Sequence, residues 1–153
     1  MSSEREEWSR RIKAVEREFL ATRFAVERTI SQVRLDSSIL TANLKLREIV
    51  GAAEMLEATY TLRLFAEFES AVRLCFQRIR KKRPPNKTED LLNSVGSHWA
   101  INANQLKNAH RVREYRNGLA HQQHREIEPI GVAESRGHLC YFLSFLPRDW
   151  FRI

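Results

Sequence analysis

Apolar side chains recur every three or four positions through the first 34 residues of the chain, with Arg and Glu filling the positions between them. This spacing puts the apolar residues on one stripe of an α-helix, so the pattern predicts a first helix over about Ser3 to Arg34. A seam of this length is typical of a long antiparallel helical hairpin. The stripe consists of Trp8, Ile12, Val15, Phe19, Thr22, Val26, Ile30 and Val33.

A polar cluster at residues 36–38 is typical of a turn, and a second long helix is predicted from about Ile39 to Arg80, with a bend near Gly51. This helix is apolar on more than one side, as central helices and helices shared with a partner subunit are. We expect it to form the core of its own chain first and a dimer contact second. Its apolar residues are Ile49, Ala53, Leu56, Tyr60, Leu64, Phe68, Ala71, Cys75 and Ile79 on the main stripe, with Phe65, Val72 and Phe76 beside it.

Two shorter helices are predicted after the Pro84-Pro85 pair, which cannot continue a helix. One begins at Thr88, where acidic residues follow, and ends near Gly96. The other begins near Asn102 or Asn104 and directs an apolar stripe toward the core. That stripe contains Leu106, Ala109, Val112, Tyr115 and Leu119.

The last segment, Ile127 to Ile153, contains two apolar runs and leaves two interpretations open. The runs pair as a short hairpin around residues 135–137, or the second run forms a short buried helix. The expected fold is therefore an all-α helical bundle: two long antiparallel helices, two shorter ones, and a small C-terminal hairpin or helix. We expect one domain over residues 1–153, with a bundle over 1–126 and a C-terminal extension over 127–153.

The chain has 153 residues and 42% hydrophobic residues, which is enough to build a core. Its formal net charge of +7 favours a polyanionic partner, and nucleic acid is the commonest one. The alternative is that the charge only aids solubility. A nucleophile elbow and a glycine-rich phosphate loop are both absent from the sequence, which argues against hydrolases of those classes.

A basic run closes the second helix just before the two prolines. We interpret it as a candidate phosphate-binding patch, to which Arg113 also belongs. The alternative is a solvated helix end, where cations complement the helix dipole. The candidate residues of the run are Arg80, Lys81, Lys82 and Arg83.

Two cysteines and three histidines lack the spacing of metal ligands, namely Cys75, Cys140, His98, His110 and His138. We expect Cys75 to act as a small buried hydrophobe, and we expect neither a metal nor a cofactor. The acidic N-terminus does not resemble a secretory signal, and the apolar stretches are too short to span a bilayer. These features favour a cytoplasmic protein with no membrane partner.

The segment Arg116–His121 contains the residues that point most directly to chemistry. Arginine binds phosphate with two parallel hydrogen bonds and stays charged. Histidine exchanges protons near neutral pH. On a regular helix, however, Arg116 and His121 lie roughly 140° apart around the axis. Two arrangements would bring such a pair together. Either Gly118 loosens the helix so that His121 turns toward Arg116, or the arginine of one subunit meets the histidine of another.

The same six residues, Arg-Asn-Gly-Leu-Ala-His, resemble the signature of the HEPN superfamily of higher eukaryotes and prokaryotes nucleotide-binding domains. That signature is an arginine, usually followed by Asn, Asp or His, and a histidine after four to six residues. The run Leu62–Val72 is similar to the long second helix of that family, and the resemblance covers about Ile39 to His124. It implies a helical bundle, usually dimeric, and in many members a metal-independent endoribonuclease of toxin–antitoxin, phage-defence or RNA-processing systems.

Carried over to this chain, the resemblance implies that Arg116 engages the scissile phosphate and that His121 acts on the 2′-hydroxyl or the leaving oxygen. Asn117 orients one of these groups, and Glu69 is a candidate carboxylate partner of Arg116. The implied partners are RNA, a second copy of the chain and an antitoxin or other partner protein. Gln123 stands where one branch of the family has a tyrosine that is nucleotidylated, so we do not expect that control here.

Two other interpretations of the sequence remain open. The first is a non-catalytic HEPN-like module that binds nucleic acid or dimerises, in which Arg116 is structural. The second is a purely structural helical adaptor, against which the charge imbalance argues.

Overall fold

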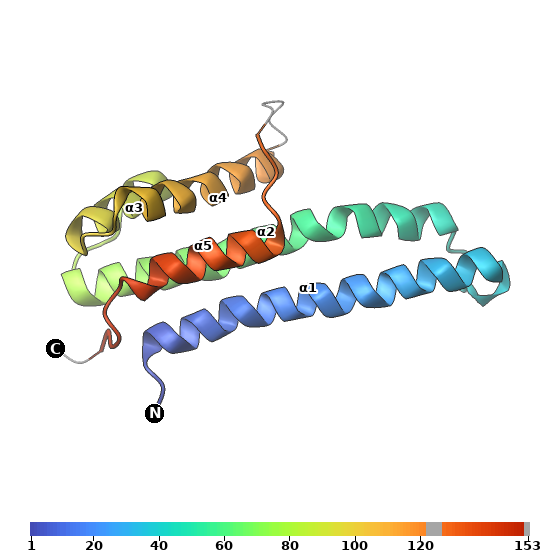
Figure 1. Ribbon diagram of the computed structural model, residues 1–153, viewed down its shortest axis with the longest axis horizontal. Coiled ribbons are helices and arrows are strands. Elements are labelled where there is room, and N and C mark those ends of the chain that lie inside the picture. Colours follow the sequence, from blue (N-terminus) through green and yellow to red (C-terminus); the bar gives the residue numbers. More distant parts are fainter. Residues whose placement is uncertain (122–126, 152–153) are drawn as a thin grey trace.

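The computed structural model describes residues 1–121 and 127–151, which form five α-helices, a short 3-10 turn and no strand (Figure 1). The two longest helices run antiparallel as a hairpin, and the three shorter helices pack on one half of it. The expected all-α bundle with two long antiparallel helices is confirmed. The elements are α1 (Glu4–Leu35), η1 (Ser37–Ile39), α2 (Leu46–Arg80), α3 (Thr88–His98), α4 (Ala103–His121) and α5 (Val132–Ser144).

Helix α1 begins with a capping box that its sequence encodes. The Ser3 hydroxyl accepts a hydrogen bond from the Glu6 backbone N–H, and the Glu6 carboxylate accepts one from the Ser3 N–H. These bonds satisfy donors that every helix start leaves free. Half of the predicted stripe is buried, namely Ile12, Val15, Phe19 and Val33.

Helix α2 begins at Leu46, so the prediction that it starts at Ile39 is wrong. Ala42 and Asn43 have positive φ angles of 57°, a left-handed conformation that a right-handed helix cannot include. The helix starts instead after Lys45, whose backbone N–H donates a hydrogen bond to the Glu48 carboxylate. From there α2 continues through Gly51 to its end.

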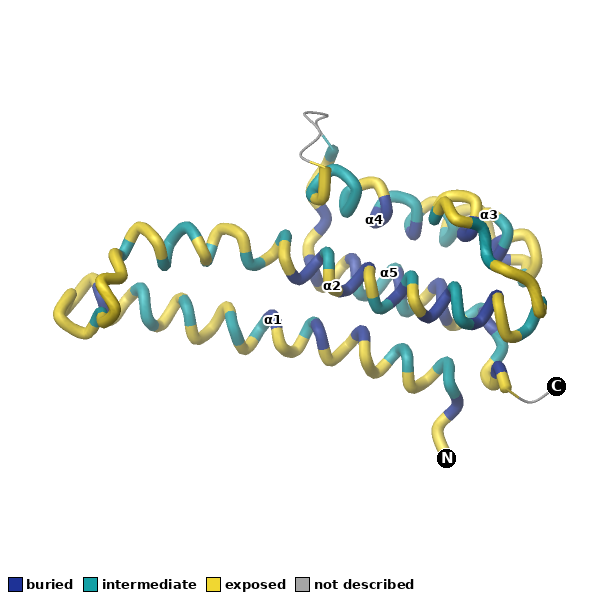
Figure 2. The backbone as a smooth tube through the Cα atoms, turned by 180° about the vertical axis from the view of Figure 1, so that it is seen from behind, coloured by how far each residue is buried: buried dark blue, intermediate teal, exposed yellow. Residues whose placement is uncertain are grey.

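The second half of α2 is the centre of the molecule. Between Tyr60 and Phe76 this helix is in contact with α1, α3, α4 and α5, and Phe65, Val72 and Phe76 are buried by the chain itself. The expectation of a central helix is therefore confirmed. Figure 2 shows that the buried residues concentrate in this part of the molecule.

The distal half of the hairpin has no third layer. We call residues 21–59 the arm; within it Val33 is the single buried residue. Phe24 and Met55 are 66% and 61% exposed there. The arm therefore consists of two helices that cover only each other, as the exposed and half-exposed residues in Figure 2 show.

The C-terminal apolar run forms the helix α5, so the hairpin alternative is not realised. Residues 135–137, which a hairpin would use as its turn, lie inside the helix. Contacts with α1, α2 and α4 select the helix, because they bury residues at helical spacing. Those residues are Val132, Ser135, Leu139, Phe142 and Leu143.

Candidate functional site

Arg116 lies on α4, where this helix faces the buried half of α2. Its guanidinium carbon is 4.5 Å from the centre of the Phe65 ring, a cation–π distance. Its Nη2 donates a hydrogen bond to Glu69 Oε2 at 3.2 Å. An arginine beside an apolar stripe needs a carboxylate, a phosphate or water, and here Glu69 supplies the carboxylate.

Glu69 is the hub of a polar cluster that joins α2, α3 and α4. Its Oε1 accepts hydrogen bonds from Arg73 Nη2 at 2.8 Å and from the Thr88 hydroxyl at 2.7 Å. Arg73 also donates to the backbone carbonyl oxygens of Pro85 and Asn86, which fixes the loop between α2 and α3. The carboxylate therefore has partners on three helices, and Arg116 is one of them.

The partners of Glu69 keep it ionised. Burial acts to raise the pKa of this carboxyl, but the hydrogen bonds from Thr88 and Arg73 and the charges of Arg73 and Arg116 outweigh it. The net result is a pKa below the ordinary value. An ionised Glu69 holds the Arg116 guanidinium in one orientation on the Phe65 ring.

Part of the Arg116 side chain remains available. Its exposed fraction is 22%, and Glu69 uses one of the five N–H donors of a guanidinium. The Nε atom is buried and has no acceptor within the described residues. Arg116 is thus an oriented cation, half-buried, with donor capacity left for an anionic ligand.

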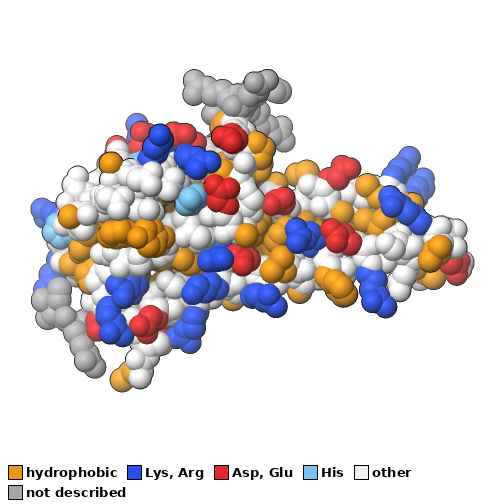
Figure 3. Space-filling model, in the orientation of Figure 1, with side chains coloured by type: hydrophobic (Ala, Val, Ile, Leu, Met, Phe, Trp, Pro, Cys, Tyr) orange, Lys and Arg blue, Asp and Glu red, His pale blue; other side chains and the backbone are white. Residues whose placement is uncertain are grey.

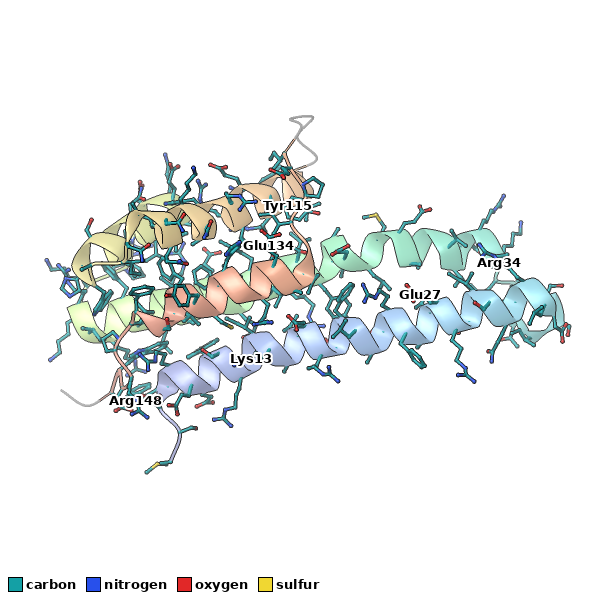
Figure 4. The ribbon with its side chains drawn as sticks, in the orientation of Figure 1. Lys13, Glu27, Arg34, Tyr115, Glu134 and Arg148 are labelled. Carbon is teal, nitrogen blue, oxygen red and sulfur yellow. The ribbon has the colours of Figure 1, made fainter. Side chains whose placement is uncertain are left out.

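His121 and Asn117 lie on the same helix but not beside Arg116. His121 is the last residue of α4 and is exposed, while Asn117 is half-buried. Figure 4 labels Tyr115, the residue before Arg116, close to this end of α4. Because α4 is regular, Arg116 and His121 point about 140° apart. Over the described chain, no hydrogen bond joins them.

Gly118 does not loosen the helix, so the first of the two predicted ways to bring His121 back is not realised. Helix α4 continues through Gly118 to His121, and Gly118 does not adopt a positive φ. A Cβ at this position would lie 2.8 Å from Ile127 Cδ1. The glycine therefore permits close packing of the segment that leads into α5. Gln123 and His124 lie outside the described residues.

Arg113 is nearly buried, with a side chain only 11% exposed. Its Nε donates to His110 Nδ1 at 3.1 Å, and the His110 Nε2 therefore donates to Asn93 Oδ1 at 2.7 Å. Burial, followed by the charge of Arg113, lowers the pKa of His110. The structure thus uses Arg113 to join α4 to α3 through a neutral histidine and leaves little of it on the surface.

The basic run lies at the other end of the bundle from His121. Arg80 ends α2 and its Nη1 donates to His98 Nδ1, while Lys81 adopts the left-handed conformation of a helix end. Lys82 and Arg83 are exposed. Helix α4 starts at this end and is about 27 Å long from its 19 residues. The structure therefore does not bring the basic run and His121 together within one chain.

The remaining candidate groups have structural roles. Cys75 is buried, and this burial raises the pKa of its thiol to about 12. His138 Nε2 donates to Glu134 on the same helix. Within residues 1–121 and 127–151, no group of three His, Cys, Asp or Glu side chains is placed to hold a metal ion. None of the helices in this part of the chain is long and apolar enough to cross a membrane.

Comparison with known proteins adds no family to these observations: no family model, no curated protein and no solved structure matches the chain. The candidate site therefore rests on its own geometry and on the resemblance of its motif.

Three members of the Arg116 cluster were not foreseen as site residues: Phe65, Arg73 and Thr88. The sequence contained one usable signal, the i, i+4 spacing of Glu69 and Arg73, which is typical of an ion pair on a helix. Thr88 was expected only to start a helix. Its contact with Glu69 depends on the loop that returns α3 to α2.

Proposed function

We propose that this protein is a metal-independent endoribonuclease of the toxin or phage-defence type, built on a HEPN-like domain and active in the cytoplasm. The observation that supports this function is the Arg116 guanidinium, which Glu69 and Phe65 orient while leaving part of it open. An oriented cation of this kind stabilises the charge that develops on a phosphate during cleavage. Five residues later, an exposed His121 offers a group that transfers protons near neutral pH.

In the proposed reaction the RNA 2′-oxygen attacks the adjacent phosphorus and the bond to the 5′-oxygen breaks. A base takes the proton of the 2′-hydroxyl, and an acid gives a proton to the leaving 5′-oxygen. Arg116 binds the phosphate, His121 serves as base or acid, and Asn117 orients one of the reacting groups. The products are a 2′,3′-cyclic phosphate and a 5′-hydroxyl.

A second copy of the chain completes the proposed site. In one copy Arg116 and His121 point apart on a regular helix, so the two side chains of that copy do not meet at one phosphate. Two-fold dimers are the commonest oligomers, and an axis near the end of α4 brings Arg116 of one copy to His121 of the other. An antitoxin that covers this end would then silence the enzyme.

The first test is cleavage of single-stranded RNA by the purified protein in EDTA. The expected products carry 2′,3′-cyclic phosphate ends, and His121→Ala removes the activity. His138→Ala is the matched control, because His138 interacts with Glu134 on α5. Equal cleavage by wild type and His121→Ala would show that the assigned site is wrong.

Mixing two inactive variants tests whether two copies share the site. Arg116→Ala and His121→Ala, unfolded together and refolded at equal amounts, form heterodimers in which one composite site is intact. Statistical mixing predicts recovery of about a quarter of the wild-type activity. Activity that stays absent in the mixture would rule out an Arg116–His121 pair across the dimer.

A non-catalytic nucleic-acid-binding or dimerisation module is the second candidate, favoured by the pairing and partial burial of Arg116. In this case Arg116→Ala lowers the melting temperature, because Glu69 loses a partner, while RNA binding persists without cleavage. The salt dependence of binding then reports phosphate contacts in either case. Cleavage in EDTA separates the two candidates.

A further inference from the structure

A cleft of about 490 Å³ lies between the start of α1 and the end of α5, away from Arg116. None of its lining residues comes from α2 or α4. Arg5 is built into the fold, since its Nη1 donates to the carbonyl oxygens of Ser144 and Leu146. Three hydroxyls and three cations line the cleft together with Glu6 and Cys140; they are Ser2, Ser9, Ser144, Arg5, Arg10 and Lys13.

A stripe of positive charge extends from this cleft along α1. Arg10, Lys13 and Arg17 are spaced by three and four residues, so they share one side of the helix, and all three are exposed. No ion pair involves any of them within the described residues. Two carboxylates nearby are already engaged, Glu6 by Arg148 and Glu16 by Arg136.

Beside the cleft, α5 presents an exposed tyrosine that pairs with a partly buried phenylalanine. Tyr141 is 52% exposed and meets the Phe145 ring edge-on, with 5.4 Å between the ring centres. One turn earlier, a Cβ on Gly137 would meet nothing within 4 Å, so no packing within the chain explains this helical glycine. Figure 3 shows hydrophobic side chains gathered beside Lys and Arg over this part of the molecule. Figure 4 labels Lys13 on the half of α1 that lies next to α5.

We infer that the α1–α5 cleft, with the cation stripe and Tyr141, is a second binding site that takes single-stranded RNA. Phosphates bind Arg10, Lys13 and Arg17, and a base stacks on Tyr141. Sites for single strands combine a basic track with aromatic platforms in this way, since every base has a face to stack. Gly137 keeps the surface next to Tyr141 low enough for the strand to approach.

The cleft would be the place where the proposed enzyme holds its substrate. That the bound strand is RNA rests on the proposed function. Helix α5 starts beside the end of α4, where Ile127 packs on Gly118. Tyr141 is nine residues into α5 from Val132, about 14 Å along the helix axis. A strand held in the cleft therefore reaches the His121 end by following α5. The cleft would bind a part of the substrate that lies away from the phosphate being cleaved.

Charge removal tests the stripe. The probe is a fluorescein-labelled, fully 2′-O-methylated single-stranded RNA, which lacks the attacking hydroxyl and stays intact. We expect Arg10→Gln/Lys13→Gln/Arg17→Gln to lower the affinity at least tenfold. In this variant the steepness of log affinity against log salt falls by about 2. Each lost phosphate contact contributes roughly 0.7, and three contacts are removed. The matched control, Arg28→Gln/Arg34→Gln/Arg47→Gln, removes the same charge from the arm and changes the affinity less than about threefold.

Equal losses in the two triple variants would overturn the inference, because they would show attraction to net charge alone. Absence of wild-type binding at low salt would overturn it as well. Tyr141→Ala separates stacking from charge: it lowers the affinity about fivefold or more and leaves the salt slope unchanged. Phe24→Ala, which removes an exposed aromatic ring from the arm, is its control.

Cleavage kinetics distinguish a failure of the cleft inference from a failure of the proposed function. With unmodified RNA, the cleft variant is expected to raise KM and leave kcat unchanged, since the cleft holds no reacting group. Cleavage with an unchanged KM in this variant would reject the cleft and keep the enzyme. RNA binding at the cleft with no cleavage by wild type would keep the cleft and reject the enzyme.

Discussion

The two halves of α2 belong to one continuous helix and differ in almost every physical respect. From Tyr60 to Phe76 the helix contacts four others and contains nine buried residues, whereas from Leu46 to Thr59 it contains none. Phe68 is fully buried in the C-terminal half, and Met55 is 61% exposed in the N-terminal half. The difference comes from the three short helices, which cover only one half of the hairpin.

The buried half is also where the candidate site lies. Phe65 and Glu69 are one turn apart on α2, and α4 places Arg116 over both. A charged cluster keeps a fixed geometry only where several elements hold it. The buried half has five helices for this purpose, whereas the arm has two. The comparison therefore predicts that equivalent substitutions have large effects in one half and small effects in the other.

The largest contrast is expected between two phenylalanines. Phe68 packs against Phe65 and Phe142, so Phe68→Ala leaves a cavity and lowers the free energy of unfolding by roughly 3–5 kcal/mol. Phe24→Ala removes a ring that is already in water and costs less than about 0.5 kcal/mol. Urea unfolding measures both. A loss above about 2 kcal/mol for Phe24→Ala would mean that the arm is covered in solution.

An intermediate contrast is expected between two glutamates of α2. Glu69→Gln removes the charge that Thr88, Arg73 and Arg116 bind, and it lowers the free energy of unfolding by about 1–3 kcal/mol at pH 7. Glu54→Gln, on the arm, changes it by less than about 0.5 kcal/mol.

The pH dependence of this contrast follows from the lowered pKa of Glu69. The unfolded carboxyl titrates near its ordinary value of 4.5, while the folded one titrates lower. The stabilisation is therefore complete above the unfolded pKa and is lost as the pH falls through the folded pKa. Unfolding measured from pH 7 to pH 3 should show the wild type and Glu69→Gln converging. A constant difference over this range would contradict the assigned hydrogen bonds.

The smallest contrast is expected between two glycines. A Cβ at Gly51 meets nothing within 4 Å, so Gly51→Ala raises the free energy of unfolding by about 0.5–1 kcal/mol through helix propensity. At Gly96 the new Cβ lies 3.2 Å from Leu106, which must shift, so Gly96→Ala gives no gain. Thermal unfolding followed by circular dichroism measures both. An equal gain at the two sites would remove the distinction between a packed half and an open one.

Hydrophobic spacing was sufficient to predict most of the helices but not all of their limits. Helix α1 lies within one residue of its predicted bounds at both ends, because its stripe and its capping box are local features. Helix α2 starts seven residues later than predicted, since no hydrophobic pattern reports the left-handed residues Ala42 and Asn43. The C-terminal run suited a strand or a helix equally, and packing on α1, α2 and α4 selected the helix.

The residue types of the candidate site could be recognised without coordinates, whereas their neighbours could not. Arg116, Asn117 and His121 stand within six residues of one another, so their chemistry and their spacing on a helix follow from the chain itself. Glu69 is 47 residues away from Arg116, and Thr88 joins them through a loop. Helical periodicity acts over one or two turns, while an ion pair needs two distant segments to meet. Only the folded chain could therefore decide that Arg116 is held by Glu69 and that His121 points away from it.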